Sequence, residues 1–213
     1  ACGPGNNGGD GLEAALHLQA WGKQPIVTWL GHEKHSPTDA LQAWQRAKNA
    51  GVSFVEQMPQ AFDLAIDAVL GIGAQRTPEG LMAQWLNGLQ ATTTPVLCVD
   101  TPTGLNANTG EFLGEGALPY PHAQRHTLSL LTLKPGLFTA DGRDGAGQVW
   151  FNNLGIETTQ TPTAWLHQSI QMPNDRPHNS HKGNFGDVSV IGGAPGMSGA
   201  AVLAAVADRK SVV

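Results

Sequence analysis

The sequence predicts an α/β fold: a mostly parallel β-sheet with helices on both faces. Short apolar runs alternate along the chain with segments whose apolar residues recur at helical spacing. The strand-like runs are continuously apolar, as is typical of parallel strands that are buried on both faces. A glycine-rich stretch at residues 3–11 leads directly into the first helical segment. Together these three patterns indicate a Rossmann-like architecture.

The glycine-rich stretch carries five glycines in the ten residues from Cys2 to Gly11. Glycine permits φ > 0 and lacks the Cβ that would keep a ligand away from the backbone. Asp10 and Glu13 resemble a capping box, so we expect the first helix to begin here and to end at Gly22. The N–H groups at such a helix start form an anion site, so we predict that the stretch holds a phosphate. An ordinary tight turn with an N-cap is the alternative.

The remaining elements of this domain follow from the same patterns. We expect strands at 26–30, 53–55, 64–70, 96–99, 127–133 and 148–151, and helices at 37–50 and 81–89. We interpret 1–157 as one domain, 158–178 as a linker rich in threonine and proline, and 179–213 as the start of a second domain. That second domain is expected to open with a strand at 186–191, a glycine loop at 192–199 and a helix at 200–207.

Composition narrows the classes of partner and compartment. The formal charge of −5 argues against a nucleic-acid partner, and neither a membrane-spanning run nor a signal peptide is visible. Two cysteines without a disulfide framework suit a reducing cytosol, so we expect a cytoplasmic protein. The chain opens on Ala1-Cys2, without a methionine and without the strand that normally precedes such a loop. We therefore interpret the sequence as a fragment.

Three polar segments are expected at the carboxyl ends of strands, where open parallel sheets bind ligands. They are residues 3–11, Asp67 with residues 71–77, and residues 100–104, and we expect them to converge on one crevice. Asp67 interrupts the apolar run 64–70, where an ionised carboxylate is costly unless a cation or several donors meet it. Neutral oxygens of Asn7 and Thr103 can join it around a singly charged cation. A carboxylate satisfied by backbone N–H groups is the alternative.

Asp100 ends its strand at the mouth of the expected crevice. A carboxylate there can hold a ribose hydroxyl or act as a general acid or base, and a turn-starting aspartate is the alternative. Residues 71–77 add backbone donors and the Arg76 cation near a second phosphate. The histidine pairs at 32/35 and 122/126 lack completing metal ligands, so we interpret the histidines as surface residues.

In this order and spacing, residues 3–11, 67–73 and 99–105 resemble the NAD(P)H-hydrate epimerase family. The segment Lys134-Pro135-Gly136-Leu137 agrees with that family. Residues 181–205 resemble the start of an ADP-dependent NAD(P)H-hydrate dehydratase domain, the first βα unit of a ribokinase-like domain. The two together resemble a bifunctional repair enzyme, and the resemblance covers about residues 1–157 and 179–207.

The resemblance implies an isomerase that interconverts the S and R forms of hydrated NAD(P)H, as part of nicotinamide cofactor repair. It implies Asp100 as the catalytic acid or base and a potassium ion held by Asn7, Asp67 and Thr103. It also implies that the small-molecule substrate, NADHX or NADPHX, contacts Asn6, Asn7, Gly8, Gly9, Asp10, Gly71, Ile72, Gly73, Ala74, Gln75, Arg76, Thr77 and Asp100.

The resemblance further implies that the full-length parent protein dehydrates the S form at the expense of ADP or ATP, a lyase reaction. The later dehydratase segment is absent here, so we expect no dehydratase activity from this chain. The family's first strand is also absent, and we expect the strands on either side of it to be unpaired. From the charge and the lack of a long apolar run, we expect neither a nucleic-acid nor a membrane partner, and a homo-oligomer of the parent stays open.

Two other interpretations stay open. Residues 3–8 fit the G-x-G-x-x-G spacing of a nicotinamide-dependent dehydrogenase, with Glu33 as a ribose ligand. That interpretation has no task for Asp67 or for the turn after Asp100. The second is a non-catalytic nucleotide-binding or scaffold module of the same fold, and retention of every expected ligand residue argues against it.

Overall fold

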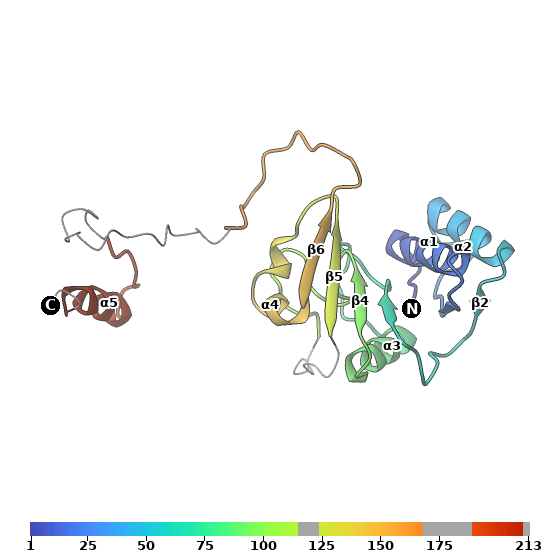
Figure 1. Ribbon diagram of the computed structural model, residues 1–213, viewed down its shortest axis with the longest axis horizontal. Helices are drawn as coiled ribbons and strands as arrows, with labels where there is room; N and C mark the ends of the chain where they lie inside the picture. Colours follow the sequence, from blue (N-terminus) through green and yellow to red (C-terminus); the bar gives the residue numbers. More distant parts are fainter. Residues whose placement is uncertain (115–123, 168–188, 211–213) are drawn as a thin grey trace, which may run out of the picture. The chain divides into compact units, whose positions relative to one another are not determined.

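The structure, a computed structural model, describes residues 1–114, 124–167 and 189–210. The chain divides into two compact units, Ala1–Ala164 and Trp165–Val213. The first unit contains both strands and helices, and most of its strands are separated along the chain by a helix (Figure 1). Its strands are β1 Ile26–Val27, β2 Ser53–Phe54, β3 Ala65–Asp67, β4 Val96–Val99, β5 Arg125–Leu130 and β6 Gln148–Asn152. Its helices are α1 Asn6–Ala20, α2 Thr38–Asn49, α3 Gly80–Ala91, the 3-10 helix η1 Pro135–Leu137 and α4 Gly142–Gly145.

The strands pair in parallel throughout the described residues, as the apolar runs predict. One sheet pairs β1 with β2, and the other has the order β3-β4-β5-β6. The register places Asp67 opposite Cys98 and Val99 opposite Leu128, so these strands bring their carboxyl ends to one edge. That edge is where the polar segments of the sequence are expected.

Residues 1–3 join the two sheets. Cys2 forms parallel bridges to Trp29, beyond β1, and to Ala68, beyond β3. The Cys2 N–H donates to the carbonyl of Thr28 at 2.8 Å, and the Gly3 N–H donates to the carbonyl of Ala68 at 3.0 Å. The expectation that both neighbouring strands are unpaired is therefore wrong at their carboxyl ends, because these three residues supply backbone partners on both sides.

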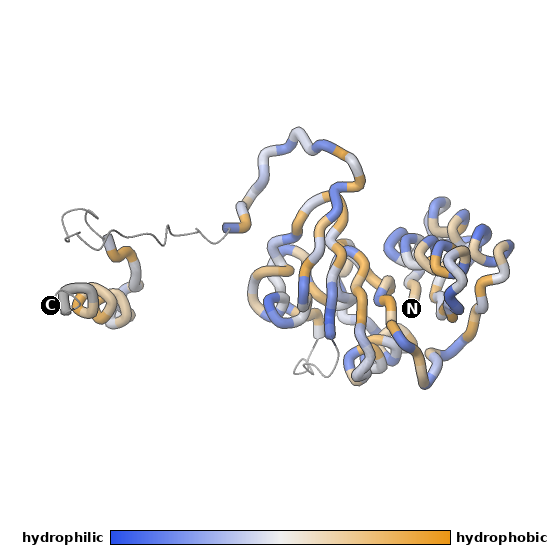
Figure 2. Tube along the Cα trace, in the orientation of Figure 1, coloured by the Kyte–Doolittle hydropathy of each residue, from blue (hydrophilic) through white to orange (hydrophobic). Residues whose placement is uncertain are grey.

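Helices cover both faces of the larger sheet, and adjacent residues of β4 show it. Successive strand residues point to opposite faces. Val99 packs in a cluster with Leu12 of α1 and Ala43 of α2, whereas Cys98 packs with Leu89 of α3. Figure 2 shows hydrophobic residues along the strands and hydrophilic ones on the outer turns of α1 and α2. The predicted arrangement of a parallel sheet between helices is confirmed.

The first helix begins earlier than the capping-box interpretation predicts. α1 begins at Asn6 with Gly5 as its N-cap, and no side chain caps it. Gly8 and Gly11 therefore lie inside the helix. A Cβ on Gly8 would overlap the carbonyl of Gly3, and one on Gly11 would lie 2.5 Å from the Cβ of Ala68. The glycines allow α1 to approach the central strands closely, so the first turn of the helix takes the place of the predicted loop.

The other predicted strands and helices of this unit are found within a few residues of their expected bounds. In the second unit, α5 Gly199–Lys210 matches the helix predicted at 200–207. The strand predicted at 186–191 falls partly outside the described residues, and 189–191 are not a strand. Ile191 and Leu203 are exposed, so no described residue of this unit covers them. Among the described residues, no helix has the length and apolarity needed to cross a membrane.

Candidate active site at the carboxyl end of the sheet

The three polar segments predicted from the sequence meet at one edge of the first unit. The start of α1 contacts the segment after β3, because the Asn7 side chain lies against Gly71. A Cβ on Gly71 would lie 3.2 Å from the amide oxygen of Asn7. The β3 and β4 ends meet where Asp67 is hydrogen-bonded to Thr103. Neighbouring segments therefore contact each other at this edge, but the cavity described below is lined only by residues between Leu70 and Met82, so a single crevice shared by all three segments stays a prediction.

Asp67 is the most buried carboxylate of the site, with only 1% of its surface exposed. Its Oδ1 accepts a 2.5 Å hydrogen bond from the Thr103 hydroxyl and one of 3.3 Å from the Val69 N–H. Its Oδ2 accepts from the Thr103 N–H at 2.9 Å. The Thr103 hydroxyl in turn accepts from the Leu70 N–H at 3.0 Å. Protein donors therefore meet this carboxylate, as the hydrogen-bonded alternative expects.

The Thr103 hydroxyl, which contacts the same carboxylate, can also offer an oxygen to a cation. The Thr103 hydroxyl oxygen keeps one lone pair beyond the two hydrogen bonds described above. The Asn7 side chain lies against Gly71, and its nitrogen is buried without a hydrogen-bond partner among the described residues. A half-turn of the amide would exchange the positions of this nitrogen and the amide oxygen. No group of three or more His, Cys, Asp or Glu side chains suited to a metal occurs in the described ranges. The donor set expected from the sequence, one carboxylate with neutral oxygens, is of the kind that suits a singly charged ion.

The first turn of α1 supplies the donors expected for an anion. The first intrahelical bond runs from the Gly9 N–H to the carbonyl of Gly5, so the N–H groups of Asn6, Asn7 and Gly8 precede the helical ladder. Asn6 is exposed, whereas Gly9 packs on α2, where a Cβ would lie 3.1 Å from the Cα of Ala40. The glycine at position 9 is thus explained by helix packing.

A cavity of about 530 Å³ lies beside the loop between β3 and α3. Its lining combines apolar side chains with amide, cationic, hydroxyl and carboxylate groups: Leu70, Gly73, Ala74, Gln75, Arg76, Thr77, Pro78, Glu79 and Met82. Five of the residues expected to contact substrate therefore line one hollow. Ile72 is 60% exposed and does not line it, and Gly71 lies against Asn7 instead.

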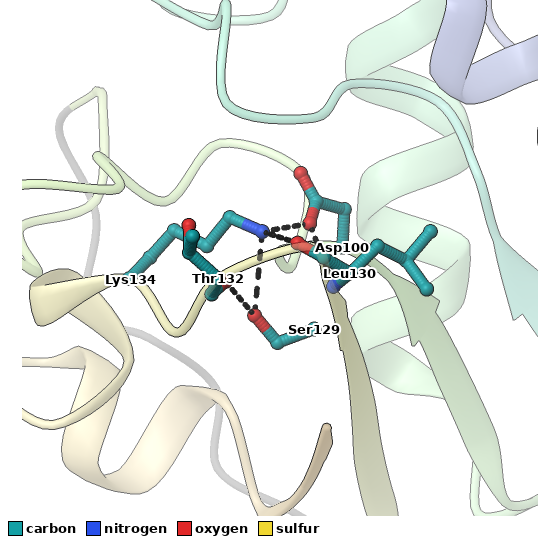
Figure 3. Close-up of polar contacts among 5 residues, drawn as sticks. All are labelled: Asp100, Ser129, Leu130, Thr132 and Lys134. Carbon is teal, nitrogen blue, oxygen red and sulfur yellow. Dashed lines mark hydrogen bonds and ion pairs between the residues drawn. The ribbon is translucent and has the colours of Figure 1, made fainter. Parts of the chain in front are cut away.

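Asp100 lies directly after the last residue of β4 and adopts a left-handed backbone conformation, with φ of 67°. Its Oδ1 accepts a 3.1 Å hydrogen bond from the Leu130 N–H at the end of β5 and pairs with the Nζ of Lys134 (Figure 3). Lys134 also donates to the carbonyl of Leu130 at 2.6 Å and lies 3.4 Å from the Ser129 hydroxyl. A buried ion pair therefore holds the expected catalytic carboxylate.

Lys134 is a site residue that the sequence reasoning did not assign. It is 8% exposed, and its partner Asp100 lies 34 positions earlier in the chain. The sequence signal that could have identified it is a lysine followed by Pro-Gly at the end of an apolar run. Asp10 lies close enough to Asp100 to interact with its charge. The pKa of the Asp10 carboxyl is raised mainly by burial, then by the charge of Asp100 and then by that of Glu13.

This parallel sheet, with carboxylates at its strand ends and a helix N-terminus beside them, defines a Rossmann-like α/β domain. The family model described as "YjeF-related protein N-terminus" matches residues 1–136, and the chain belongs to that family. The matched segment contains α1, the cavity-lining loop, Asp67, Asp100 and Lys134.

Curated relatives are similar over most of this chain. The bifunctional NAD(P)H-hydrate repair enzymes of Leishmania braziliensis and Escherichia coli K12 are each 33% identical to it, over 96% and 93% of this chain and 39% of each relative. The Vibrio cholerae enzyme of that name is 33% identical over 95% of this chain and 42% of its own length. The chain thus spans about two fifths of these relatives. The crystal structure of yeast ynu0 matches with a TM-score of 0.58 and 22% identity, over 73% of this chain and 65% of the yeast chain, which supports the fold.

Proposed function

We propose that the first unit is an NAD(P)H-hydrate epimerase, which interconverts the S and R forms of hydrated NADH and NADPH. The observation that carries the proposal is the family match over residues 1–136, which contain all three converging polar segments. The names of the relatives support it. The buried Asp67 also favours this reaction over the dehydrogenase that the glycine spacing alone permits, because a dehydrogenase has no task for this carboxylate.

The reaction needs a group that moves protons at the hydrated ring carbon. For that carbon to change configuration, the bond to its hydroxyl must break and re-form on the opposite face. A carboxylate can give a proton to the departing hydroxyl and take one from the water that returns. We assign this task to Asp100, since it lies at a strand end and keeps part of its side chain, 14%, exposed to solvent.

The remaining site residues are proposed to bind and orient the dinucleotide. The free N–H groups at the start of α1 suit a phosphate of the diphosphate. The cavity beside the β3–α3 loop is lined by apolar side chains and by the Arg76 cation, which suits a nucleoside with its phosphate. Held at two places, the substrate would have its hydrated ring carbon next to Asp100.

We also propose that a potassium ion binds beside Asp67, with oxygen atoms of Asn7 and Thr103 as further ligands. The ion would supply a fixed positive charge at the joined ends of β3 and β4. The residues of this chain hold those ends together by the Thr103–Asp67 hydrogen bonds, and the cation would add to that organisation. The substrate loop that follows β3 would then begin from a rigid base.

For the longer protein, we propose a second activity, the dehydration of S-NAD(P)HX at the expense of ADP or ATP. The names of the bifunctional relatives and the Gly192–Gly199 stretch with the helix after it support this. A cytoplasmic location is proposed because both cysteines of the chain are free thiols. A homo-oligomer is compatible with the proposal.

The direct test uses this chain and the R form of hydrated NADH. A separate dehydratase that accepts only the S form, supplied with ADP, converts each epimerised molecule to NADH, which is followed by absorbance. We expect NADH to appear faster with the chain than without it, and in proportion to its concentration. A rate equal to that of the spontaneous epimerisation would overturn the proposed function.

A further inference from the structure

We propose that Lys134 is a positioning residue of this active site. It ties one carboxylate oxygen of Asp100 to the end of β5 and leaves the other oxygen, Oδ2, to exchange protons with the substrate. The inference rests on the proposed function and deepens it, because it separates the group that contacts substrate from the group that aims it. Figure 3 shows the five residues that carry it.

The backbone of Asp100 needs support from its surroundings. A φ of 67° is left-handed, which costs a residue with a Cβ roughly 1–2 kcal/mol, although aspartate tolerates it better than most. The Asp100 N–H continues the ladder by donating to the carbonyl of Leu128 at 2.8 Å. The chain then turns out of the strand, so the carboxylate comes back toward the end of β5. Such a conformation persists where neighbouring contacts hold it.

The two carboxylate oxygens have different surroundings. Oδ1 accepts a 3.1 Å hydrogen bond from the N–H of Leu130, which is the next donor along β5. If β4 were one residue longer, a backbone carbonyl of β4 would accept this bond, so Oδ1 takes its place. Oδ1 also pairs with Lys134. Oδ2 accepts no hydrogen bond from any residue in the described part of the chain, and Figure 3 shows it directed away from the lysine. Oδ2 is therefore the oxygen with free lone pairs for a ligand.

The ammonium group of Lys134 has three protons, and three protein acceptors surround it. They are Oδ1 of Asp100, the carbonyl of Leu130 at 2.6 Å and the hydroxyl of Ser129 at 3.4 Å. The Ser129 hydroxyl donates its own proton to the carbonyl of Thr132 at 3.0 Å, so its lone pairs are available to the lysine. With all three protons engaged, Lys134 has none left for the substrate and acts through Asp100.

The turn that follows holds the lysine backbone in place. Pro135 begins the 3-10 helix η1, and its ring fixes φ at the position after Lys134. Gly136 donates to the carbonyl of Ala107 at 2.7 Å, and a Cβ there would overlap the carbonyl of Asn106. The Lys-Pro-Gly segment is thus anchored to the loop after β4, which also carries Asp100. Lysine and aspartate are held on one scaffold.

The test begins with Lys134→Met in the full chain, which keeps an unbranched side chain one atom shorter than lysine and removes its charge. We expect kcat for epimerisation to fall roughly 100-fold, the loss typical of a misplaced reacting group, while the Kd for hydrated NADH changes less than about threefold. Lys23→Met, which removes an exposed lysine of the α1–β1 connection, is the matched control and should keep the wild-type kcat. A Lys134→Met variant with kcat within threefold of wild type would overturn the positioning role.

Two further measurements separate positioning from a general loss of structure. In Lys134→Ala, propylammonium should restore activity saturably, whereas propanol should not, since it fills the space without the charge. In the Asp100→Asn background, Lys134→Met should lower kcat by less than about threefold, because the lysine acts through Asp100. Equal rescue by propanol, or a second full loss in the double variant, would contradict the inference.

These outcomes are distinct from a failure of the proposed function. A wild-type chain that does not epimerise hydrated NADH overturns the proposed function itself. A wild-type chain that epimerises beside an equally active Lys134→Met variant overturns the positioning role alone.

Discussion

The hydroxyl of Thr103 donates a 2.5 Å hydrogen bond to Oδ1 of Asp67, and this bond joins the end of β3 to the turn after β4. Both side chains are 1% exposed, so no water replaces a lost donor. The same hydroxyl accepts the Leu70 N–H, so it organises the residue that precedes the substrate loop. The contact is the physical reason that a carboxylate is tolerated inside an apolar strand.

Thr103→Val should therefore destabilise the fold. It removes one donor from a buried carboxylate and one acceptor from a backbone N–H, each worth about 1–3 kcal/mol. Thr101→Val is the matched control, because Thr101 is 0% exposed and its hydroxyl lacks a partner among the described residues. Urea unfolding should show a lower free energy of unfolding for the first variant and an unchanged or higher one for the second. Equal losses would show that the hydroxyl of Thr103 contributes nothing specific.

Asp100→Asn should abolish most turnover while the dinucleotide still binds. The amide cannot take up or release a proton at neutral pH, and loss of a general acid or base typically costs 10²–10⁴-fold in rate, as an order of magnitude. Steady-state kinetics gives kcat, and calorimetric titration with the hydrated dinucleotide gives Kd. Epimerisation at the wild-type rate by this variant would remove Asp100 from its catalytic role.

Potassium should raise the thermal stability of the chain above that found in choline chloride at equal ionic strength. A cation beside Asp67 binds the folded state alone, and such binding stabilises by mass action. Magnesium should have a smaller effect, since it prefers an octahedral shell that includes several waters. Asp67→Asn should weaken the response to potassium. Identical melting temperatures in potassium and choline salts would leave Asp67 with a structural task only.

Gly11→Ala should destabilise the first unit, although alanine favours helices by up to about 1 kcal/mol over glycine. The new Cβ would lie 2.5 Å from the Cβ of Ala68 and 2.8 Å from Sγ of Cys2, and overpacking typically costs 1–3 kcal/mol, as an order of magnitude. Gly73→Ala is the control, because no atom lies within 4 Å of a Cβ there. Thermal melts should separate the two variants; similar melting temperatures would count against close packing of α1.

The pH dependence of stability should carry a contribution from Asp10. Burial raises the pKa of its carboxyl, and the charges of Asp100 and Glu13 raise it further. A raised folded-state pKa contributes stability below the unfolded value of about 3.9, and that stability is lost as the pH rises through the folded pKa. Relative to wild type, Asp10→Asn should therefore become more stable as the pH rises from about 3 to 7. Urea unfolding across that range checks the slope, and a difference that stays constant with pH would contradict it.

The sequence by itself determined the parallel sheet, the alternation of strands and helices, and the three polar segments. The physical reason is that these features are local. A strand buried on both faces is continuously apolar whatever its neighbours are, as in 96–99. Asp67 can be recognised from the sequence because the apolar residues around it in the run show that its charge is buried, and burying a charge is costly.

Only the tertiary structure decided how distant segments meet. α1 begins at Asn6 because Gly8 and Gly11 pack on Gly3 and Ala68, contacts that no local pattern encodes. Residues 1–3 act as a strand because β1 and β3 offer them partners on both sides. Lys134 reaches Asp100 across 34 positions because β4 and β5 are neighbours in register. Hydrogen bonds and close packing between such segments depend on their positions in space, which the order of residues alone does not display.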